Sequence, residues 1–407
     1  MKESTRDVGE EKFALQAPTT CENAQRLLRG LQLPRPILLE GSPGVGKTSL
    51  VAAVARLARK TLVRINLSEQ TDVTDLFGAD LPVEGEEGGR FAWRDGPFLQ
   101  ALKAGHWVVF DELNLASQSV LEGLNACFDH RAEVYIPELG KKFAINHTKV
   151  RIFACQNPLS QGGGRKGLPQ SFLNRFSQVY VEPLGRQDLV FIACAIYPEF
   201  PTDMLTAMVD FNSQLHEETM VKKSWGSKGS PWEFNLRDLF RWCDLLKANQ
   251  PQETLNPGEY VGLIYRDRMR SAVDKTKVEE LYEARMGKKW PLYQASRRVF
   301  QGQSIVQAGH SFLLRGSSNN VGVARSQGET SPILLHHCLE PLESLMKCVE
   351  MGWLAILVGP QSSGKTSLVR LLADLAGTTL NILPMNSTMD TTELLGGFEQ
   401  VMHFLLL

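Results

Sequence analysis

The chain has 407 residues, a length that predicts two or three domains with buried cores. Hydrophobic residues make up 43% of it and charged residues 22%, proportions that are ordinary for globular proteins. The formal net charge of −1 argues against a surface that coats nucleic acid, so no direct nucleic-acid binding is expected.

The cysteines and the apolar segments indicate the cellular compartment of the protein. Seven cysteines are scattered without a CxxC pair, which predicts reduced thiols and neither disulfides nor a metal site. The charged N-terminus is not followed by the apolar segment of a signal peptide. No apolar run approaches the roughly 20 residues of a membrane span. We therefore expect a soluble, intracellular protein with no membrane partner.

The first part of the chain alternates short apolar runs with helical patterns. Residues 1–16 are polar and are expected to be disordered. One helical pattern begins near Ala17, and a second runs from Thr48 to Arg59. The apolar runs expected to form buried strands are 36–40, 61–65, 107–110, 150–154 and 179–181. This alternation predicts an α/β fold with a largely parallel sheet.

Helical patterns dominate from about Gln187 onward. The clearest extends from Asn235, the expected N-cap, to Leu246, with an apolar stripe along one face. A Gly/Ser-rich stretch further on indicates a loop. We therefore expect a core domain at 17–186, a helical domain at 187–290 and a linker at 291–330.

The end of the chain repeats its beginning. Residues 359–369 match residues 41–51, and the same register continues without a gap to Gly396. A register held over this length predicts an internal duplication. Residues 331–407 are therefore expected to form the first part of a second core, truncated before its later strands.

A glycine-rich segment between the first strand and the second helix has the form of a phosphate-binding P-loop. Glycines let backbone N–H groups approach a polyphosphate, and the helix N-terminus adds a favourable dipole. Lys47 is expected to reach the β- and γ-phosphates of ATP, and Thr48 to ligate Mg²⁺. The alternative is a glycine turn, but the flanking elements and the second occurrence favour nucleotide binding. The binding residues predicted are Gly41, Ser42, Pro43, Gly44, Val45, Gly46, Lys47 and Thr48, with Gly359, Gly364, Lys365 and Thr366 in the second copy.

An acidic pair ends the strand at 107–110, 64 residues after the P-loop lysine. Asp111 is expected to face Mg²⁺, and Glu112 the attacking water. An apolar strand that ends in Asp-Glu is usually a solvated strand end. Its spacing from the P-loop makes the catalytic interpretation the better one.

Two further polar residues could serve the same site. Asn157 follows the strand at 150–154 and could contact the γ-phosphate or the water, although an Asn-Pro turn is the alternative. Arg175 lies between two apolar positions and could project as an arginine finger, although a single arginine is normally a surface or salt-bridge residue.

The order of these motifs resembles the AAA+ superfamily, within the branch that holds MoxR ATPases, dynein and midasin. Residues 65–80, 114–125 and 161–169 resemble the midasin family in particular. The resemblance extends from about residue 17 to residue 400.

The resemblance implies an αβα AAA+ ATPase core with a helical lid, repeated in tandem so that six modules build a ring. It implies Asp111 and Glu112 as the Walker B pair, Asn157 as sensor 1, Arg175 as the arginine finger and Arg237 as sensor 2. The implied cofactors are ATP and Mg²⁺, and the implied partners are neighbouring AAA+ modules. The implied role is removal of assembly factors from pre-60S ribosomal particles in the nucleolus and nucleoplasm.

Two differences from the family limit how far its properties can be expected of this chain. The chain holds one full module and the start of another, and it lacks the acidic region and the adhesion domain of midasin. It therefore resembles a fragment or a truncated form. In such rings the arginine finger of one site comes from the next module, so the finger for the first P-loop would lie beyond Leu407. We therefore expect ATP binding with very slow hydrolysis.

Two other functions stay open at this point. A nucleotide-dependent scaffold would bind ATP without useful turnover, which a comparison of the wild type with Glu112→Gln would reveal. A motor or helicase of related fold would need a stalk-length heptad insertion or a basic DNA-facing loop, and neither is visible in the sequence.

Overall fold

The computed structural model describes residues 13–82, 91–129, 133–136, 139–146, 149–158, 167–249, 255–290, 298–316, 335–386, 389 and 394. The chain divides into two compact units. The first consists of Met1–Pro257 with Met269–Lys288, and the second of Gly258–Arg268 with Lys289–Leu407.

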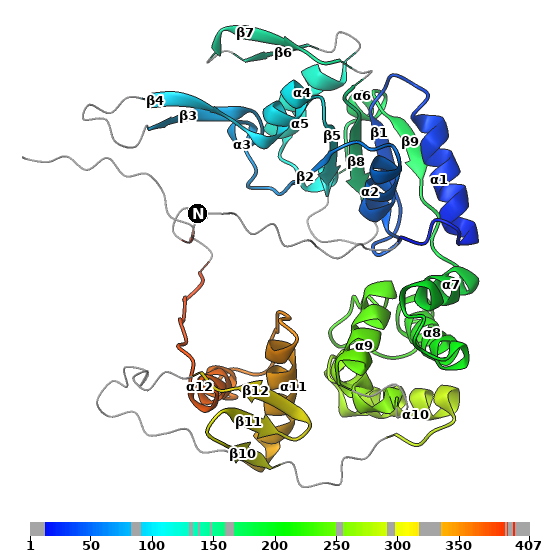
Figure 1. Ribbon diagram of the computed structural model, residues 1–407, viewed down its shortest axis with the longest axis vertical. Helices are drawn as coiled ribbons and strands as arrows, with labels where there is room; N and C mark the ends of the chain where they lie inside the picture. Colours follow the sequence, from blue (N-terminus) through cyan, green and yellow to red (C-terminus); the bar gives the residue numbers. More distant parts are fainter. Residues whose placement is uncertain are drawn as a thin grey trace, which may run out of the picture. The chain divides into compact units, whose positions relative to one another are not determined.

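A parallel five-stranded sheet forms the centre of the first unit (Figure 1). The strands follow the order β2-β5-β8-β1-β9. Their bounds are Ile37–Glu40 for β1, Leu62–Asn66 for β2, Trp107–Asp111 for β5, Ile152–Gln156 for β8 and Ser177–Tyr180 for β9. The predicted parallel sheet and its strands are confirmed, with small shifts at the ends.

Helices cover both faces of this sheet, because apolar side chains alternate between the faces along each strand. Along β5, Val108 and Phe110 join one core, whereas Trp107 and Val109 join the other. The first core is completed by α3 (Val73–Phe77), α4 (Pro97–Ala104) and α5 (Gln118–Phe128). The second is completed by α1 (Pro18–Gly30) and α2 (Lys47–Leu57). The αβα arrangement is therefore confirmed.

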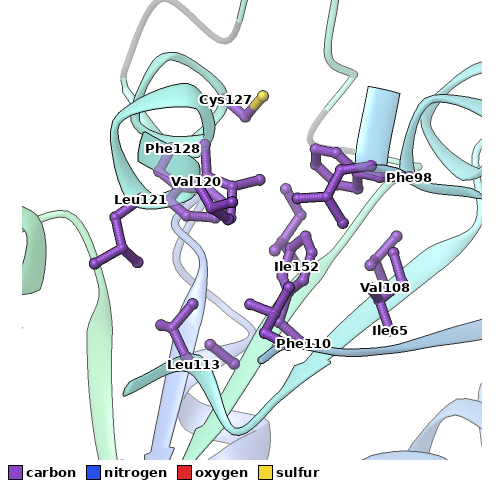
Figure 2. Close-up of a cluster of buried hydrophobic side chains, with 14 of the residues drawn as sticks. Ile65, Phe98, Val108, Phe110, Leu113, Val120, Leu121, Cys127, Phe128 and Ile152 are labelled. Atoms are coloured by element: carbon purple, nitrogen blue, oxygen red, sulfur yellow. The ribbon is translucent and has the colours of Figure 1, made fainter. Parts of the chain in front are cut away.

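Aromatic rings connect the layers of the first core (Figure 2). The Phe110 ring meets the rings of Phe98 and Phe128 edge-on, with centroids 5.1 and 6.3 Å apart. Edge contacts of this kind add to the free energy gained by burying each ring. The packing of Phe110 against these rings thus fixes the end of β5, which carries Asp111.

Two antiparallel hairpins and two short helical turns decorate the sheet. Their bounds are Gly78–Pro82 for β3, Phe91–Asp95 for β4, Glu133–Ile136 for β6, Lys141–Ala144 for β7, Leu113–Leu115 for the 3-10 turn η1 and Gln170–Leu173 for α6. Neither pair belongs to the five strands expected from the apolar runs of the sequence. The glycine-rich tip at 85–89 and most of the loop at 161–169 lie outside the described residues.

A helical part follows the sheet within the first unit. It contains α7 (Arg186–Ile196), α8 (Thr202–His216), the π-helix η4 (Glu217–Val221), α9 (Leu236–Asn249) and α10 (Ala272–Met286). The Phe211 ring packs edge-on against Trp242 and Tyr282. At the start of α9, the Asn235 side chain accepts the backbone N–H of Arg237, as predicted for an N-cap.

The second unit contains a small antiparallel sheet in the order β10-β11-β12. Its elements are β10 (Val299–Gln301), β11 (Ile305–Ala308), β12 (Ser311–Leu314), the 3-10 turns η6 (Pro257–Glu259) and η8 (His336–Cys338), the π-helix η7 (Gly262–Arg266), α11 (Leu339–Glu350) and α12 (Lys365–Ala376). Within the range 291–330, which was expected to be a linker, residues 299–314 form these three strands. The physical reason is that β11 alternates exposed and buried residues, and Val306 and Ala308 pack with α11.

The duplicated segment forms no sheet in the described residues. Residues 354–358 and 379–383 match β1 and β2 by the repeat, yet neither is a strand. Leu354, Ile356 and Leu383 are exposed. In the first unit β1 and β2 are separated by β5 and β8, so they cannot pair with each other. The described residues contain no counterpart of β5 or β8, and a second core is not seen.

Of the residues expected to be disordered, 1–16, the structure describes only 13–16. Residues 1–12 lie outside the described part of the chain. Phe13 and Leu15, by contrast, pack against the core that contains α1 and α2. The disorder prediction is wrong for these two residues, because their apolar side chains gain free energy by burial. Within the described ranges, no helix combines the length and apolarity that crossing a membrane requires.

Burial of the thiols leads to a first prediction. Burial raises the pKa of Cys127 and of Cys155 to about 12, whereas Cys21 is exposed. Because only the thiolate reacts, iodoacetamide at pH 8 should modify Cys21 at least about 100-fold faster than either buried thiol. Time-resolved peptide mass spectrometry measures the three rates. Equal rates in the folded protein would contradict the buried placement, and equal rates in urea are the control.

Candidate functional site

Most of the polar residues predicted for the first site meet at one edge of the parallel sheet. Parallel strands end on the same edge, and the register pairs Glu40 with Gln156 and Asn66 with Asp111. The P-loop therefore follows β1 at the same edge where Glu112 follows β5 and Asn157 follows β8. In open α/β sheets, ligands bind at this edge.

Backbone conformation shapes the P-loop. Gly44 and Gly46 have φ angles of 78° and 81°, in the left-handed region that side chains disfavour. A Cβ on Gly44 would also lie 3.0 Å from the side chain of Asn235, at the start of α9. Gly46 is the N-cap of α2, which begins at Lys47. The loop thus leads directly into a helix N-terminus that can attract an anion.

Lys47 is buried at the centre of the site. Its ammonium group donates to the carbonyl oxygens of Gly41 and Ser42 at 2.8 and 2.9 Å. It also donates to the Asn157 Oδ1 at 2.7 Å. Burial lowers the pKa of Lys47, and the nearby Arg237 guanidinium lowers it further, while carboxylates at the site oppose this shift. An anionic ligand would compensate the buried charge.

The Asp111 carboxylate is surrounded by donors. Its Oδ2 accepts the Thr48 hydroxyl at 3.1 Å, together with Arg64 Nε at 3.1 Å and Nη2 at 2.5 Å. The sequence reasoning missed Arg64, which sits in β2 in the middle of an otherwise apolar run. A charged residue within an apolar run that was predicted to be a buried strand was the signal that could have identified it.

Glu112 and Asn157 are joined directly. The Asn157 amide donates to Glu112 Oε1 at 2.9 Å, and Asn114 in turn donates to the Asn157 carbonyl oxygen at 3.0 Å. The Glu112 backbone is left-handed, with φ 56° and ψ 43°. Asn157 therefore bridges Lys47 and Glu112, an arrangement that favours the polar-site interpretation over a plain Asn-Pro turn.

A pocket of about 590 Å³ opens beside the P-loop. Gly44, Val45 and Gly46 form one wall, and Arg237 and Phe240 of α9 form another. Tyr197 and Phe13 also line it, with the Tyr197 hydroxyl donating to Asp244 at 2.6 Å. Arg237, which the resemblance implies as sensor 2, lines this pocket together with the P-loop, whereas Phe13 was not among the predicted site residues.

Arg175 is placed elsewhere. It lies between α6 and β9, and its Nη1 donates to the Asn125 carbonyl oxygen of α5 at 3.0 Å. A carboxylate oxygen of Asp129 lies 3.7 Å away from the same nitrogen. These contacts hold the guanidinium against α5, and it is not among the residues that line the pocket at the P-loop.

The second P-loop reproduces the local geometry of the first. Lys365 donates to the carbonyl oxygens of Gly359 and Pro360 at 3.0 and 2.6 Å, as Lys47 does in the first loop. Gly364 has a φ of 79° and caps α12. Ser362 takes the left-handed position of Gly44, with a φ of 62°. No described residue stands near Lys365 as Asn157 does near Lys47.

Comparisons with known proteins place these observations in a family. Residues 36–176 match the AAA domain of the dynein-related subfamily, and residues 188–289 match the midasin AAA lid domain. Midasin of Dictyostelium discoideum is 52% identical over 410 residues, which cover 96% of this chain and 7% of that protein. The chain carries a midasin-like AAA module.

Two further relatives match this chain. Midasin of Giardia intestinalis is 40% identical across 96% of this chain and 8% of its own length. An uncharacterized protein of Staphylococcus saprophyticus is 33% identical over 209 residues, which cover 50% of this chain and 70% of that protein. The chain spans less than a tenth of the length of these two midasins.

The side chains of Thr48 and Asp111 offer oxygen donors to a metal ion. The Thr48 hydroxyl and the Asp111 carboxylate are hard oxygen donors that meet at 3.1 Å, the type of ligand that Mg²⁺ prefers. Among the described residues, no cluster of three or more His, Cys, Asp or Glu side chains could hold a metal ion. The site therefore fits a Mg²⁺ ion that shares its coordination with phosphates and water, rather than an all-protein metal cage.

Proposed function

We propose that this midasin-like module binds ATP with Mg²⁺ at the first P-loop and hydrolyses it. The observation that supports this most strongly is the convergence of Lys47, Thr48, Asp111, Glu112 and Asn157 on one sheet edge. Each of these side chains contacts another of the group or the P-loop backbone. A glycine turn without a ligand would not need these partners.

Binding follows from groups that are already in place. The backbone N–H groups of the loop and the N-terminus of α2 would receive the phosphates. Lys47 would exchange the carbonyl oxygens of Gly41 and Ser42 for phosphate oxygens, which are stronger acceptors. The pocket between the P-loop and α9 would take the base and ribose, with Arg237 directed toward the phosphates.

Hydrolysis requires a metal site and an oriented water. Thr48 and Asp111 would hold Mg²⁺, which supplies charge stabilisation to the phosphates when bound. Glu112 would accept a proton from the attacking water or orient it. Asn157 would position Glu112 relative to Lys47, since its side chain contacts both.

We assign the arginine finger to an intermolecular or inter-module role. Arg175 contacts α5 and does not line the pocket, which supports a role at the nucleotide site of another module. The first P-loop would receive its own arginine from a neighbouring module. Because such an arginine can contribute orders of magnitude to the rate, hydrolysis by this chain alone is expected to be very slow.

The division of the chain is part of the proposal. Residues 17–186 would act as the AAA core, 187–290 as its lid and 331–407 as the beginning of a second AAA core. By similarity to midasins, the module would sit in a ring of AAA modules. That ring would remove assembly factors from pre-60S particles in the nucleus.

A comparison of binding with turnover tests the function. Wild type and Glu112→Gln should bind MgATP, in fluorescence titrations with a labelled ATP analogue, with affinities within about threefold of each other. Single-turnover hydrolysis should fall at least about 100-fold in Glu112→Gln, because a positioned base contributes 10²–10⁴ in rate. Absence of ATP binding would refute the proposal. Binding with equal turnover in both proteins would favour a nucleotide-dependent scaffold.

A further inference from the structure

The pairing of Arg64 with Asp111 has no role in the scheme above. Arg64 lies in β2, whose register against β5 brings it beside the strand that ends at Asp111. Two of its nitrogens reach the same carboxylate oxygen, Oδ2, which also accepts the Thr48 hydroxyl. Three donors therefore converge on one oxygen. This oxygen belongs to the carboxylate assigned above to Mg²⁺.

The number of lone pairs on Oδ2 makes its pairing with Arg64 incompatible with metal binding at the same oxygen. An ionised carboxylate offers about two lone-pair positions per oxygen. Three donors fill those of Oδ2, while Mg²⁺ requires ligand oxygens at about 2.0–2.1 Å in near-octahedral order. A guanidinium at 2.5 Å stands where such a cation or its water shell would have to approach. Arg64 must leave Oδ2 before a metal can use it.

The surroundings allow Arg64 to leave. The Arg64 side chain is 56% exposed, whereas that of Asp111 is only 15% exposed. The guanidinium can therefore swing into solvent at little cost, while the carboxylate stays in place. The second copy has Ile382 at the position of Arg64, so the pairing belongs to the first module alone.

Charge balance gives the pairing a function. Asp111 and Glu112 are consecutive acidic residues at the rim of a pocket proposed to receive a polyphosphate. Without a cation, Asp111 would repel the anionic phosphates. The Arg64 guanidinium, with two nitrogens on one carboxylate oxygen, compensates that charge, and Mg²⁺ would compensate it when bound.

We propose that Arg64 is a positioning residue that acts as a built-in counter-ion for Asp111 and competes with Mg²⁺ for its Oδ2. This inference rests on the proposed Mg²⁺ site at Thr48 and Asp111. Arg64 sets how strongly nucleotide binding depends on the metal. It compensates the charge of Asp111 and moves away when the metal binds.

The test is the ratio of two dissociation constants for the same fluorescent ATP analogue, one measured in EDTA and one in excess MgCl₂. In Arg64→Met the metal-free constant should rise, because Asp111 then repels the phosphates. The magnesium constant should fall, because the competitor is gone. The ratio is therefore expected to increase roughly three- to tenfold over wild type. Arg64→Lys, which keeps the charge but not the two-nitrogen fork, should give an intermediate ratio.

Two controls separate the possible failures. Arg151→Met changes the net charge equally, and Arg151 donates instead to the Leu33 carbonyl oxygen, so its ratio should match wild type. Asp111→Asn should abolish most of the magnesium dependence. If wild type shows no magnesium dependence, the proposed metal site fails. If wild type depends on magnesium through Asp111 but Arg64→Met has an equal or smaller ratio, the counter-ion role of Arg64 is wrong.

Discussion

Replacing Lys47 with alanine is expected to weaken MgATP binding about 100-fold. The ammonium group is buried and already surrounded by oxygen acceptors at 2.7–2.9 Å. Phosphate oxygens would replace two of these acceptors, and hydrogen bonds to charged groups contribute about 1.5–3 kcal/mol each. A loss of about 3 kcal/mol corresponds to a factor of about 100. Isothermal titration with MgATP measures the effect.

The duplicated loop supplies a matched control for this variant. Lys365 donates to the two corresponding carbonyl oxygens and to Ser363 Oγ, and none of the residues that the structure describes corresponds to Asn157. Lys365→Ala should therefore leave the affinity at the first site unchanged. Thermal unfolding of both variants without nucleotide would show whether the fold is intact. A folded Lys47→Ala protein that binds MgATP within threefold of wild type would show that the P-loop lysine is not a ligand.

Replacing Phe110 with alanine is expected to destabilise the first unit by about 3–5 kcal/mol. Phe110 is fully buried, and its ring contacts Phe98 and Phe128. Substitutions of buried phenylalanine by alanine lose both the transfer free energy and the packing around the cavity. Domains are typically stable by only about 5–15 kcal/mol, so much of the folding free energy of this unit is at stake.

Hydrogen exchange is the suitable measurement, because the chain has two units and bulk unfolding could mix them. Exchange of peptides from β5 and β8 should accelerate in Phe110→Ala. Phe191 on α7 is 41% exposed, so Phe191→Ala should change the stability by less than about 1 kcal/mol. Wild-type protection of β5 in Phe110→Ala would mean that the aromatic cluster contributes little to the stability of the sheet.

Local patterns explain why much of the first unit was predictable. The strands were short apolar runs, and their buried residues alternate between two cores, as in β5. The P-loop, Asp111 and Asn157 followed strands of one parallel sheet, so their meeting at one edge followed from topology. Asn235 was recognisable as an N-cap because a polar residue preceded a regular apolar stripe.

Other features depended on contacts that a linear pattern does not carry. Arg64 looked like an interruption in a strand until the pairing of β2 with β5 placed it beside Asp111. Phe13 lay in a polar segment, and only the folded chain shows it beside the pocket. The small sheet at 299–314 was missed because its strands are only three or four residues long.

Because the backbone of Glu112 is left-handed, selection for thermal stability and selection for ATP turnover should favour different residues at this position. A residue other than glycine in this conformation costs roughly 1–2 kcal/mol. A population of variants screened only for heat resistance should therefore accumulate Glu112→Gly, which relieves the strain and removes the carboxylate. A population screened for ATP turnover should retain glutamate despite that cost. The two screens applied to one library would diverge at this single position.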